Sequence, residues 1–359
     1  MFLALRELKF NWLRSLLLGG VAALLAFMVF MLLGLTRDLS EDSAAWMLNS
    51  PAQTFVTTAD AGGNFSRSFL DAATVTAVKK AVPDAAPFAQ SFISFGVNSK
   101  SSTQLGAVML GLDPRAFIAP QLTGGSAAVA QALSGAGAVV DASLQNEGVK
   151  LGDTLILRPS GEQLRVTGFT TGARLNHQPV VFVSMEHWQA LNPRANGTVS
   201  AVALPEAAPS GLPAGLTLQS RPQALQALPG YKEEQGSLLM IQVFLVAVSA
   251  LVMTVFFYVM TLQKTAQFGL LKALGARLST LAGSVVAQVA ALTLGALGLA
   301  AAAMFGVVQI LPQGMPFTLS WGGVALAGAL LLAVSLLGSL LSLRVVAQAD
   351  PLQALGQQG

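Results

Sequence analysis

The sequence predicts an α-helical membrane protein with four transmembrane helices and a large α+β extracytoplasmic domain between the first and second helices. The first observation is composition: 53% of the 359 residues are hydrophobic and only 10% are charged, whereas soluble proteins carry about 25% charged residues. The second is the distribution of charge. No Asp, Glu, Lys or Arg occurs in residues 15–36, 235–263 or 278–343. Charge-free segments of this length are typical of membrane spans.

A helix needs about 20 apolar residues to cross a hydrocarbon core of about 30 Å. The first two charge-free segments each hold one such helix, and the third is long enough for two. Within it, Pro312 and Pro316 would end the helix on either side, so residues 312–318 are expected to form an outer hairpin loop. The expected spans are residues 15–36, 237–263, 279–311 and 319–343.

Basic residues beside the spans predict which side of the membrane each segment occupies. The short segments 1–14, 264–278 and 344–359 hold seven Lys and Arg against two acidic residues, and the other 13 Lys and Arg lie in residues 37–236 beside 15 Asp and Glu. Positive charge marks the cytoplasmic side. Both termini, including the tail at 344–359, are therefore expected in the cytoplasm and residues 37–236 outside, in a multi-pass protein of the cell (cytoplasmic) membrane.

Residues 1–14 are expected to form a cytoplasmic interfacial helix, because their apolar residues recur on one face. The span that follows contains Gly19, Gly20 and several alanines, which allow a second helix to approach closely, so a homodimer is predicted. A cleaved signal peptide is the alternative for this end of the chain. It is disfavoured because Leu35–Asp38 offers no Ala-x-Ala-like cleavage site.

Residues 37–236 have the composition of a soluble domain that mixes helices and strands. Asp71–Val82 places valines at helical spacing before a proline, and an alanine-rich helix is expected at Ser126–Leu133. Pro159–Gly161 would turn two strands into a hairpin. The domain is expected to have two lobes, and residues 192–230 give no periodic signal. Strands are expected at Val139–Val140, Thr154–Leu157, Gln163–Thr167 and Val180–Val183.

No sequence motif for catalysis or for a resident cofactor occurs in the chain. The patterns GxxxxGK[ST], HExxH and GxSxG are absent, so ATP is not expected to bind this polypeptide by itself, and no catalytic or metal residue is predicted. The lack of cysteine excludes disulfides, iron–sulfur clusters and covalent c-type haem. For His177 and His187, structural or surface roles are favoured over metal ligation.

Met28, in the first span, is a candidate ligand for haem iron, because a thioether is a soft axial ligand and an apolar groove suits a porphyrin. Met31 and Tyr258 are further candidates, the latter through its phenol. The alternative for the methionines is ordinary packing or lipid contact, and for the tyrosine it is the preference of aromatic side chains for helix ends.

Residues 264–278, between the second and third spans, are expected to form a cytoplasmic helix. Phe268, Leu271, Leu274 and Leu278 recur every three or four residues as an apolar stripe, while the polar residues lie off it. Such a helix can rest on lipid headgroups or dock a cytoplasmic partner, and the pattern alone leaves both open.

The order of one span, a large outer domain and three further spans resembles the FtsX-like permease family of MacB/FtsX-type ABC transporters. The family pattern E-x-G-x-x-[KR]-A-[LI]-G-A is similar to residues 267–276, with Gln267 in place of the usual Glu. Asp350–Leu355 resembles the family's ending. Segments similar to the haem-exporting members are residues 27–35, 256–275 and 314–317.

The resemblance implies a homodimer that works with two separate ATPase subunits, with haem as the transported substrate and no cofactor bound permanently. ATP would bind the partner. The helix at 264–278 would be the coupling element that the ATPase moves, and Arg37 would lie near the outer headgroup level, toward which the haem carboxylates would point. The implied coupling residues are Gln267, Gly269, Leu271, Lys272, Leu274 and Gly275.

Two alternatives stay open from the sequence. One is a MacB-like exporter of another amphiphile, such as a peptide, lipoprotein or drug. The other is an FtsX-like transducer that moves no solute and regulates a cell-wall hydrolase through its outer domain. Haem binding distinguishes the first hypothesis from both alternatives, and capture of an outside protein indicates the transducer. None of the three makes this chain an enzyme or a nucleic-acid-binding protein.

Overall fold

The computed structural model describes residues 12–98, 104–125, 128–207, 211–310 and 320–348. The chain divides into two compact units: a helical unit, which contains the chain up to Arg37 and from Ser237 onward, and an outer unit, Asp38–Gly236. Residues 1–11, 311–319 and 349–359, where most of the expected interfacial helix, the hairpin loop and most of the tail fall, lie outside the described residues.

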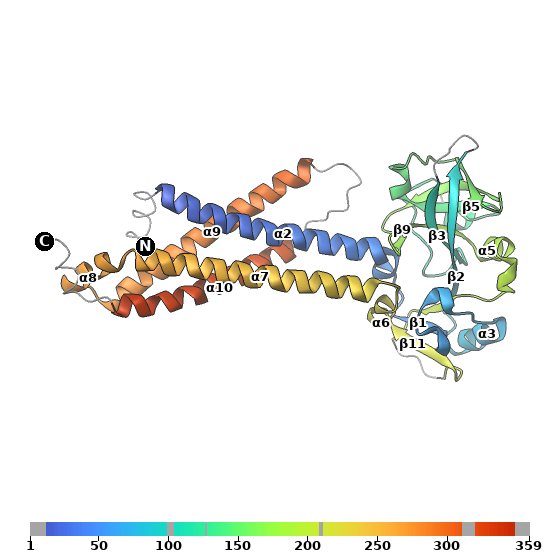
Figure 1. Ribbon diagram of the computed structural model, residues 1–359. Coiled ribbons are helices and arrows are strands. Elements are labelled where there is room, and N and C mark those ends of the chain that lie inside the picture. The colour runs from blue at the N-terminus through green and yellow to red at the C-terminus, as the bar shows by residue number, and fades with distance from the viewer. Residues whose placement is uncertain (1–11, 99–103, 126–127, 208–210, 311–319, 349–359) are drawn as a thin grey trace. The chain divides into compact units, whose positions relative to one another are not determined.

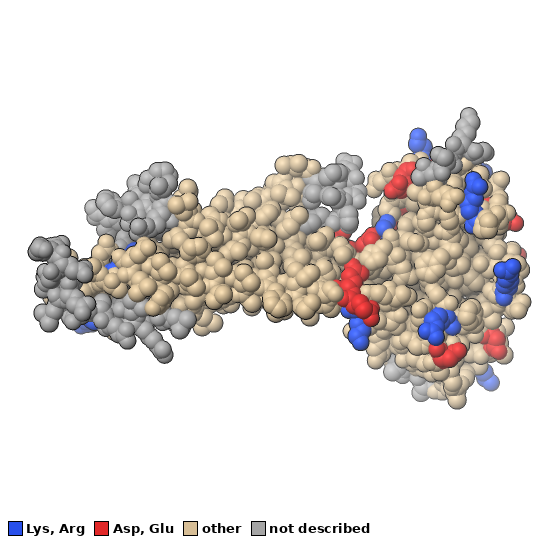
Figure 2. Space-filling model, in the orientation of Figure 1, with Lys and Arg blue, Asp and Glu red and all other residues tan. Residues whose placement is uncertain are grey.

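Four helices of the described chain are long and apolar enough to cross a membrane, which confirms the predicted fold class. Figure 2 shows the helical unit almost without charged side chains. The candidate spans are Leu16–Ser40, Tyr231–Leu262, Leu278–Ile310 and Trp321–Ser339. They lie in helices α2 (Trp12–Asn49), α7 (Tyr231–Leu262), α9 (Leu278–Ile310) and α10 (Trp321–Gln348), with the short α8 (Thr265–Ala273) between the second and third (Figure 1).

Helices α2 and α7 extend well beyond the spans expected from hydropathy, and α10 continues past residue 343 to Gln348. Helix α7 begins at Tyr231, before the expected start of its span at residue 237, and carries Glu233 and Glu234 in its first turn. Acidic side chains stabilise that end of a helix through its dipole, so charge ends the membrane segment without ending the helix. Helix α2 likewise continues past Arg37 to Asn49.

The helical unit packs around α9, whose buried residues recur every three or four positions. Val289 and Met304 of this helix are fully buried, the first with Phe257 of α7 and the second with Phe30 of α2. Small residues allow a close contact on α10, where a Cβ on Gly338 would lie 2.3 Å from Thr254 Oγ1.

The outer unit is built on an eleven-stranded sheet in which six strands close into a ring. The strand β2 (Ala86–Val97) pairs with β3 on one side and, through its second half, with β6 on the other. The ring continues from β3 (Leu105–Leu112) to β9 (Gln178–Ser184), β5 (Gly137–Asp141), β7 (Gln163–Thr170) and β6 (Thr154–Arg158).

A second lobe grows from the first residues of β2. There Ala86–Phe88 pair with β10 (Ala201–Leu204), which pairs with β1 (Thr54–Thr58), and β1 pairs with the edge strand β11 (Leu216–Ser220). The two lobes therefore share one strand. The remaining elements are α3 (Ala72–Ala81), β4 (Gly124–Gly125), α4 (Val129–Ala132), β8 (Arg174–Leu175), α5 (Met185–Leu191), α6 (Arg221–Gln226) and four short 3-10 turns, η1 (Ala59–Ala61), η2 (Phe65–Arg67), η3 (Ala142–Gln145) and η4 (Pro193–Ala195).

Both faces of the sheet are buried along its central strands, whereas β4 and the edge strand β11 are partly or fully exposed. Successive residues of a strand point to opposite faces. Phe88 and Ala89, neither of which has exposed surface, accordingly belong to two separate hydrophobic clusters. Aromatic rings fill the first cluster: Phe88 contacts Trp46 at 5.1 Å and Phe65 at 5.2 Å between ring centroids, both edge-on. Edge-on contacts of this kind add to the burial of the rings.

Several sequence-based expectations for the outer unit are met. Helix α3 is capped by Asp71, whose carboxylate accepts a 2.7 Å hydrogen bond from Thr74 N, and hydrogen bonds from Thr74 lower the pKa of Asp71. Strands β6 and β7 form the expected antiparallel hairpin.

Other expectations are corrected. Of the helix expected at Ser126–Leu133, residues 126 and 127 lie outside the described residues, and the described part forms the short helix Val129–Ala132 after an extended Ala128. Residues 192–230 gave no periodic signal, yet they contain β10, β11 and α6. Strand β10 is buried on both faces, and such strands show no alternation of apolar and polar residues.

Replacing Gly111 with alanine should lower the stability of the outer unit by about 1–3 kcal/mol, because overpacking a filled core forces neighbours to move. A Cβ there would lie 2.3 Å from Trp188 Cβ, and Trp188 is held by a 3.1 Å hydrogen bond to Ser91 Oγ. Gly106→Ala, on the same strand, is the control, since its Cβ meets only the side-chain amide of Gln178 at 3.4 Å. Denaturant unfolding of the full-length protein measures both, and equal midpoints would contradict the packing argument.

Candidate functional site

The described residues contain no group of three or more His, Cys, Asp or Glu side chains placed to hold a metal ion. His187 lies in the first turn of α5, where its backbone N–H donates to Ser184 Oγ at 3.1 Å. His177 lies in the outer unit with Asp42 and Glu234 as neighbours. The substrate and coupling candidates of the sequence lie in the helical unit.

One face of α2 is left uncovered by the rest of the helical unit. Leu17, Leu24 and Met28 are 64%, 60% and 49% exposed, and Val21 and Leu35 continue the same stripe. Spacings of three, four and seven residues keep these side chains on one face of the helix. In a membrane such a face meets lipid or another helix.

The three haem candidates do not converge within one chain. Met31 packs against the buried cluster of α2, α9 and α10, whereas Met28 and Tyr258 are both partly exposed. Gln242 Nε2 of α7 donates a 2.8 Å hydrogen bond to Thr36 Oγ1 of α2, so these two residues lie at the same level along their helices. From that level Met28 lies eight residues and Tyr258 sixteen residues along their helices, about 12 Å and 24 Å at 1.5 Å per residue. The two side chains therefore lie at different depths.

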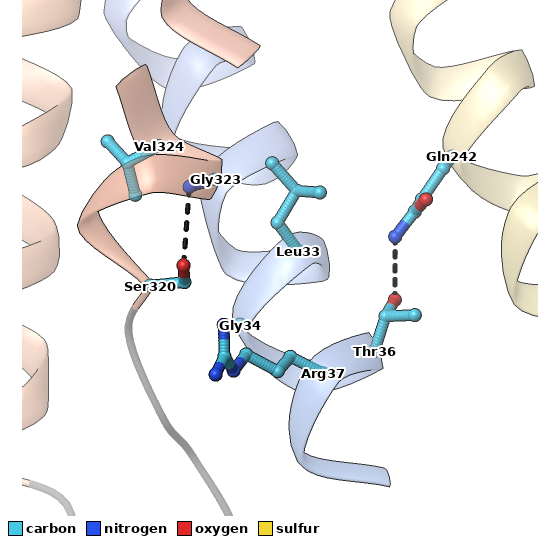
Figure 3. A pocket seen from close by; sticks show the side chains of 8 residues that line it. All are labelled: Leu33, Gly34, Thr36, Arg37, Gln242, Ser320, Gly323 and Val324. Carbon is cyan, nitrogen blue, oxygen red and sulfur yellow. Dashed lines mark hydrogen bonds between the residues drawn. The ribbon is translucent and has the colours of Figure 1, made fainter. Parts of the chain in front are cut away.

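A cavity of about 290 Å³ lies where α2 and α7 meet the start of α10 (Figure 3). Its wall mixes apolar and polar groups. Besides accepting from Gln242, Thr36 donates to Leu32 O at 2.8 Å, and Ser320 Oγ accepts from Gly323 N at 3.3 Å. The lining residues are Leu33, Gly34, Thr36, Arg37, Gln242, Ser320, Gly323 and Val324.

Arg37 supplies the cationic group of this cavity. Its side chain is exposed and in Figure 3 runs from α2 back toward Gly34. A guanidinium binds carboxylate and phosphate groups through paired hydrogen bonds. The arrangement can therefore receive the acidic head of an amphiphile whose apolar part lies along the helices.

At the opposite end of α7, a polar contact fastens this helix to α9. Lys264 Nζ donates to Gln288 Oε1 at 2.7 Å, and Gln288 is only 6% exposed. A buried amide requires such a partner. Beside it, Phe268 of α8 is buried in the same cluster as Phe257 and Val289. Helix α8 is thus anchored to both neighbouring helices.

The backbone conformation at the end of α8 explains why the sequence pattern has a glycine at position 275. Its N–H donates to Lys272 O at 3.0 Å, and Ala276 N donates to Leu271 O at 2.9 Å. These are the two hydrogen bonds of a Schellman cap, which needs a left-handed residue, and Gly275 has φ +89°. Glycine adopts this conformation without a Cβ clash.

The coupling residues implied by the resemblance occupy different faces of α8. Gly269 is buried, Leu271 and Lys272 are partly buried, and Gln267 and Leu274 are exposed. Leu274, which the sequence placed on the apolar stripe with Phe268 and Leu271, is 76% exposed. The α-helix ends at Ala273, so helical periodicity does not extend across the cap.

Two exposed leucines instead form an apolar pair on α8. Leu270 is 48% exposed and Leu274, one turn further, is 76% exposed. Leu278, also assigned to the stripe, is 44% exposed and belongs to α9. An exposed apolar pair of this kind can rest on lipid headgroups or contact another chain.

Sequence reasoning missed the polar residues that join the helices, Gln242 and Gln288. The spans were recognised by their lack of charge, and neutral polar residues within them were not singled out. A glutamine inside a charge-free segment was the available signal, because a polar side chain in hydrocarbon requires a partner from another helix.

Comparison with protein families matches residues 239–351 to the FtsX-like permease C-terminal domain. Two relatives are the hemin transport system permease proteins HrtB, putative by name, of Staphylococcus haemolyticus and Staphylococcus epidermidis. Each is 24% identical to this chain, over 358 and 357 residues respectively, which is 99% of this chain and 99% of the relative.

Two solved structures align with about half of the chain. The extracellular domain of the noncanonical ABC-type transporter YknZ from Gram-positive bacteria covers 47% of this chain and 98% of its own, with 8% identity and a TM-score of 0.34. The periplasmic region of MacB from Actinobacillus actinomycetemcomitans covers 49% and 91%, with 13% identity and a TM-score of 0.37.

Replacing Gly275 with alanine should destabilise the end of α8 by about 1–2 kcal/mol, the cost of a Cβ in left-handed backbone. Gly275→Asn is the matched control and should lose less, because asparagine tolerates this conformation. Hydrogen exchange of residues 270–278 in the full-length protein measures the effect. Equal exchange in the two variants would show that the left-handed cap does not hold this end of the helix.

Proposed function

We propose that this chain, which carries an FtsX-like permease domain, is the membrane subunit of an ABC-type pump that exports haem from the cytoplasmic membrane with a separate ATPase. Four span-length helices and the similarity over 99% of the chain to hemin transport permeases support the proposal. The chain itself contains no GxxxxGK[ST] loop to bind ATP phosphates. ATP hydrolysis therefore belongs to an HrtA-like partner subunit.

In this pump both termini and α8 face the cytoplasm, and residues 37–236 lie outside. The basic residues of the short segments beside the spans support this orientation. Helix α8 then presents Gln267, Leu270 and Leu274 to the ATPase, all three of them exposed. Because Phe268 is buried with α7 and α9, a push on α8 moves both helices.

Two copies of the chain pair through the exposed stripe of α2. Leu17, Val21, Leu24, Met28 and Leu35 repeat with the three-and-four spacing that lets helices interlock along a seam. Two ATPase subunits complete the assembly. Met28 then lies at the seam, where the two protomers together provide the apolar groove that a single chain lacks.

The observation that carries the haem assignment is the position of Met28. It is a half-exposed thioether on an apolar helix face, and the same helix carries Arg37, which lines the cavity. A thioether can bind haem iron, and a guanidinium can bind carboxylate. Haem offers both groups on one planar amphiphile.

Hemin titrated into the purified full-length protein should shift the Soret band, and Met28→Ala should weaken binding about tenfold, equivalent to about 1.4 kcal/mol. Met31→Leu is the matched control and should bind as the parent does, since Met31 packs internally.

An unshifted Soret band in the parent protein would rule out haem as the substrate. Binding of another amphiphile would then support a MacB-like exporter. Specific retention of a cell-wall hydrolase by the outer unit would support the transducer instead.

Leu274→Asp should abolish stimulation of ATP hydrolysis in the complex while the chain still folds, because the side chain is exposed and supports no core. Ser279→Asp, exposed in the first turn of α9, places the same charge nearby and should leave coupling intact. ATPase activity with and without hemin is the measurement. Normal stimulation in Leu274→Asp would contradict the assignment of α8 as the contact.

A further inference from the structure

A cluster of polar side chains joins three segments of the outer unit. His177 Nδ1 lies 2.9 Å from Asp42 Oδ2, and His177 Nε2 lies 3.2 Å from Glu234 Oε2. Ser43 Oγ lies 3.0 Å from Nε2 and donates to Glu234 Oε2 at 3.1 Å. Asp42 also forms an ion pair with Arg174. One imidazole thus connects the end of α2, the start of α7 and the turn between β8 and β9.

The backbone around this cluster is unusual at two places. Asn176 and His177 form the two-residue turn between β8 and β9, and both have positive φ, +52° and +59°. Glycine is the usual second residue of such a turn. Helix α2 is interrupted at Ala44, with φ −151°, and the carbonyl of Ser43 accepts a 2.8 Å hydrogen bond from Asn176 N.

A side chain held in a conformation that favours glycine suggests that the side chain itself has a role. The ring is half exposed, while Asp42 and Glu234 are about one-fifth exposed. Glu234 Oε1 is buried and has no hydrogen-bond partner in the part of the chain that the structure describes. A carboxylate in that position is stabilised by a neighbouring cation.

The protonation state of the ring decides how many carboxylates it can hold. Imidazolium donates from both nitrogens, whereas neutral imidazole donates from one. Ser43 has one hydroxyl proton, so it cannot donate both to Nε2 of a neutral ring and to Glu234 Oε2. Arg174 stays on Asp42, donates to His177 O at 3.0 Å and to Ser143 Oγ at 2.9 Å, and so keeps the turn in place.

We propose that His177 is a proton-operated clasp: as imidazolium it holds Asp42 of α2 and Glu234 of α7 together, and on losing its proton it releases Glu234. Glu234 is the partner released because its contact is the longer one and because Arg174 secures Asp42 independently. Imidazolium can donate to both carboxylates, whereas the neutral ring can donate to only one of them.

The clasp acts on the first turn of α7. Tyr231 of that turn also contacts Ser40 of α2 through its hydroxyl at 2.9 Å, so release of Glu234 loosens this turn without detaching it. The consequence for transport rests on the proposed function: helices α2 and α7 continue into the first two spans, so protonation outside the membrane would restrain their outer ends during export.

Hydrogen–deuterium exchange of the full-length protein tests the clasp without any transport assay. After correction for intrinsic rates, residues 230–237 should exchange about three- to tenfold faster at pH 8 than at pH 6, the range expected for a partly exposed charged hydrogen bond. Helix α3 serves as the internal reference and should exchange equally at both values.

The variants His177→Asn and His177→Gly remove the imidazole of the clasp while keeping a residue that tolerates the positive φ of the turn. Both residues suit the positive φ, so the outer unit should unfold at the parent's midpoint or above. In both variants residues 230–237 should exchange at the fast rate at pH 6 and pH 8 alike. His187→Gln, a change of the other histidine, should keep the parent's pH dependence.

The proposal is overturned if the parent shows no pH dependence at residues 230–237, or if His177→Asn retains it. Neither outcome depends on haem. Conversely, if the exchange results hold and the chain binds no hemin, the clasp stands and the proposed function fails.

Discussion

Hydrocarbon offers no hydrogen-bond partners, and this constraint governs the helical half of the chain. Charge is confined to the ends of the spans, and polar residues near those ends make contacts between helices, as Thr36 does with Gln242 and Lys264 with Gln288. One contact lies near each end of the expected second span, residues 237–263, in α7. They fix its depth against α2 and its attachment to α9, and so set the framework on which the proposed substrate groove and coupling surface depend.

The same constraint explains what the sequence could predict. The spans follow from composition alone, because few other structures tolerate so long a run without charge. The helix expected at Asp71–Val82 and the turn at Pro159–Gly161 follow from local rules of helix periodicity and hairpin formation, and both are confirmed. Strand β10 was missed because burial on both faces removes the alternation by which strands are recognised.

The candidate site was harder to predict because its parts are distant in sequence, and in the proposed dimer they come from two chains. Met28 was identified by chemistry, but its exposure on an uncovered face could come only from packing. Leu274 was placed on the apolar stripe of one helix, but periodicity does not report where a helix ends, and α8 ends at Ala273. The contact of His177 with Asp42 spans more than a hundred residues, and no local pattern encodes it.

Strand β2 gives the outer unit a mechanical property. Its first residues pair with one lobe, and its remaining length is flanked by strands of the closed ring. Bending the lobes apart would shear several backbone hydrogen bonds of β2 at once, since they are loaded together along the strand. The shared strand therefore makes the two lobes one stiff body, which can transmit a displacement without absorbing it internally.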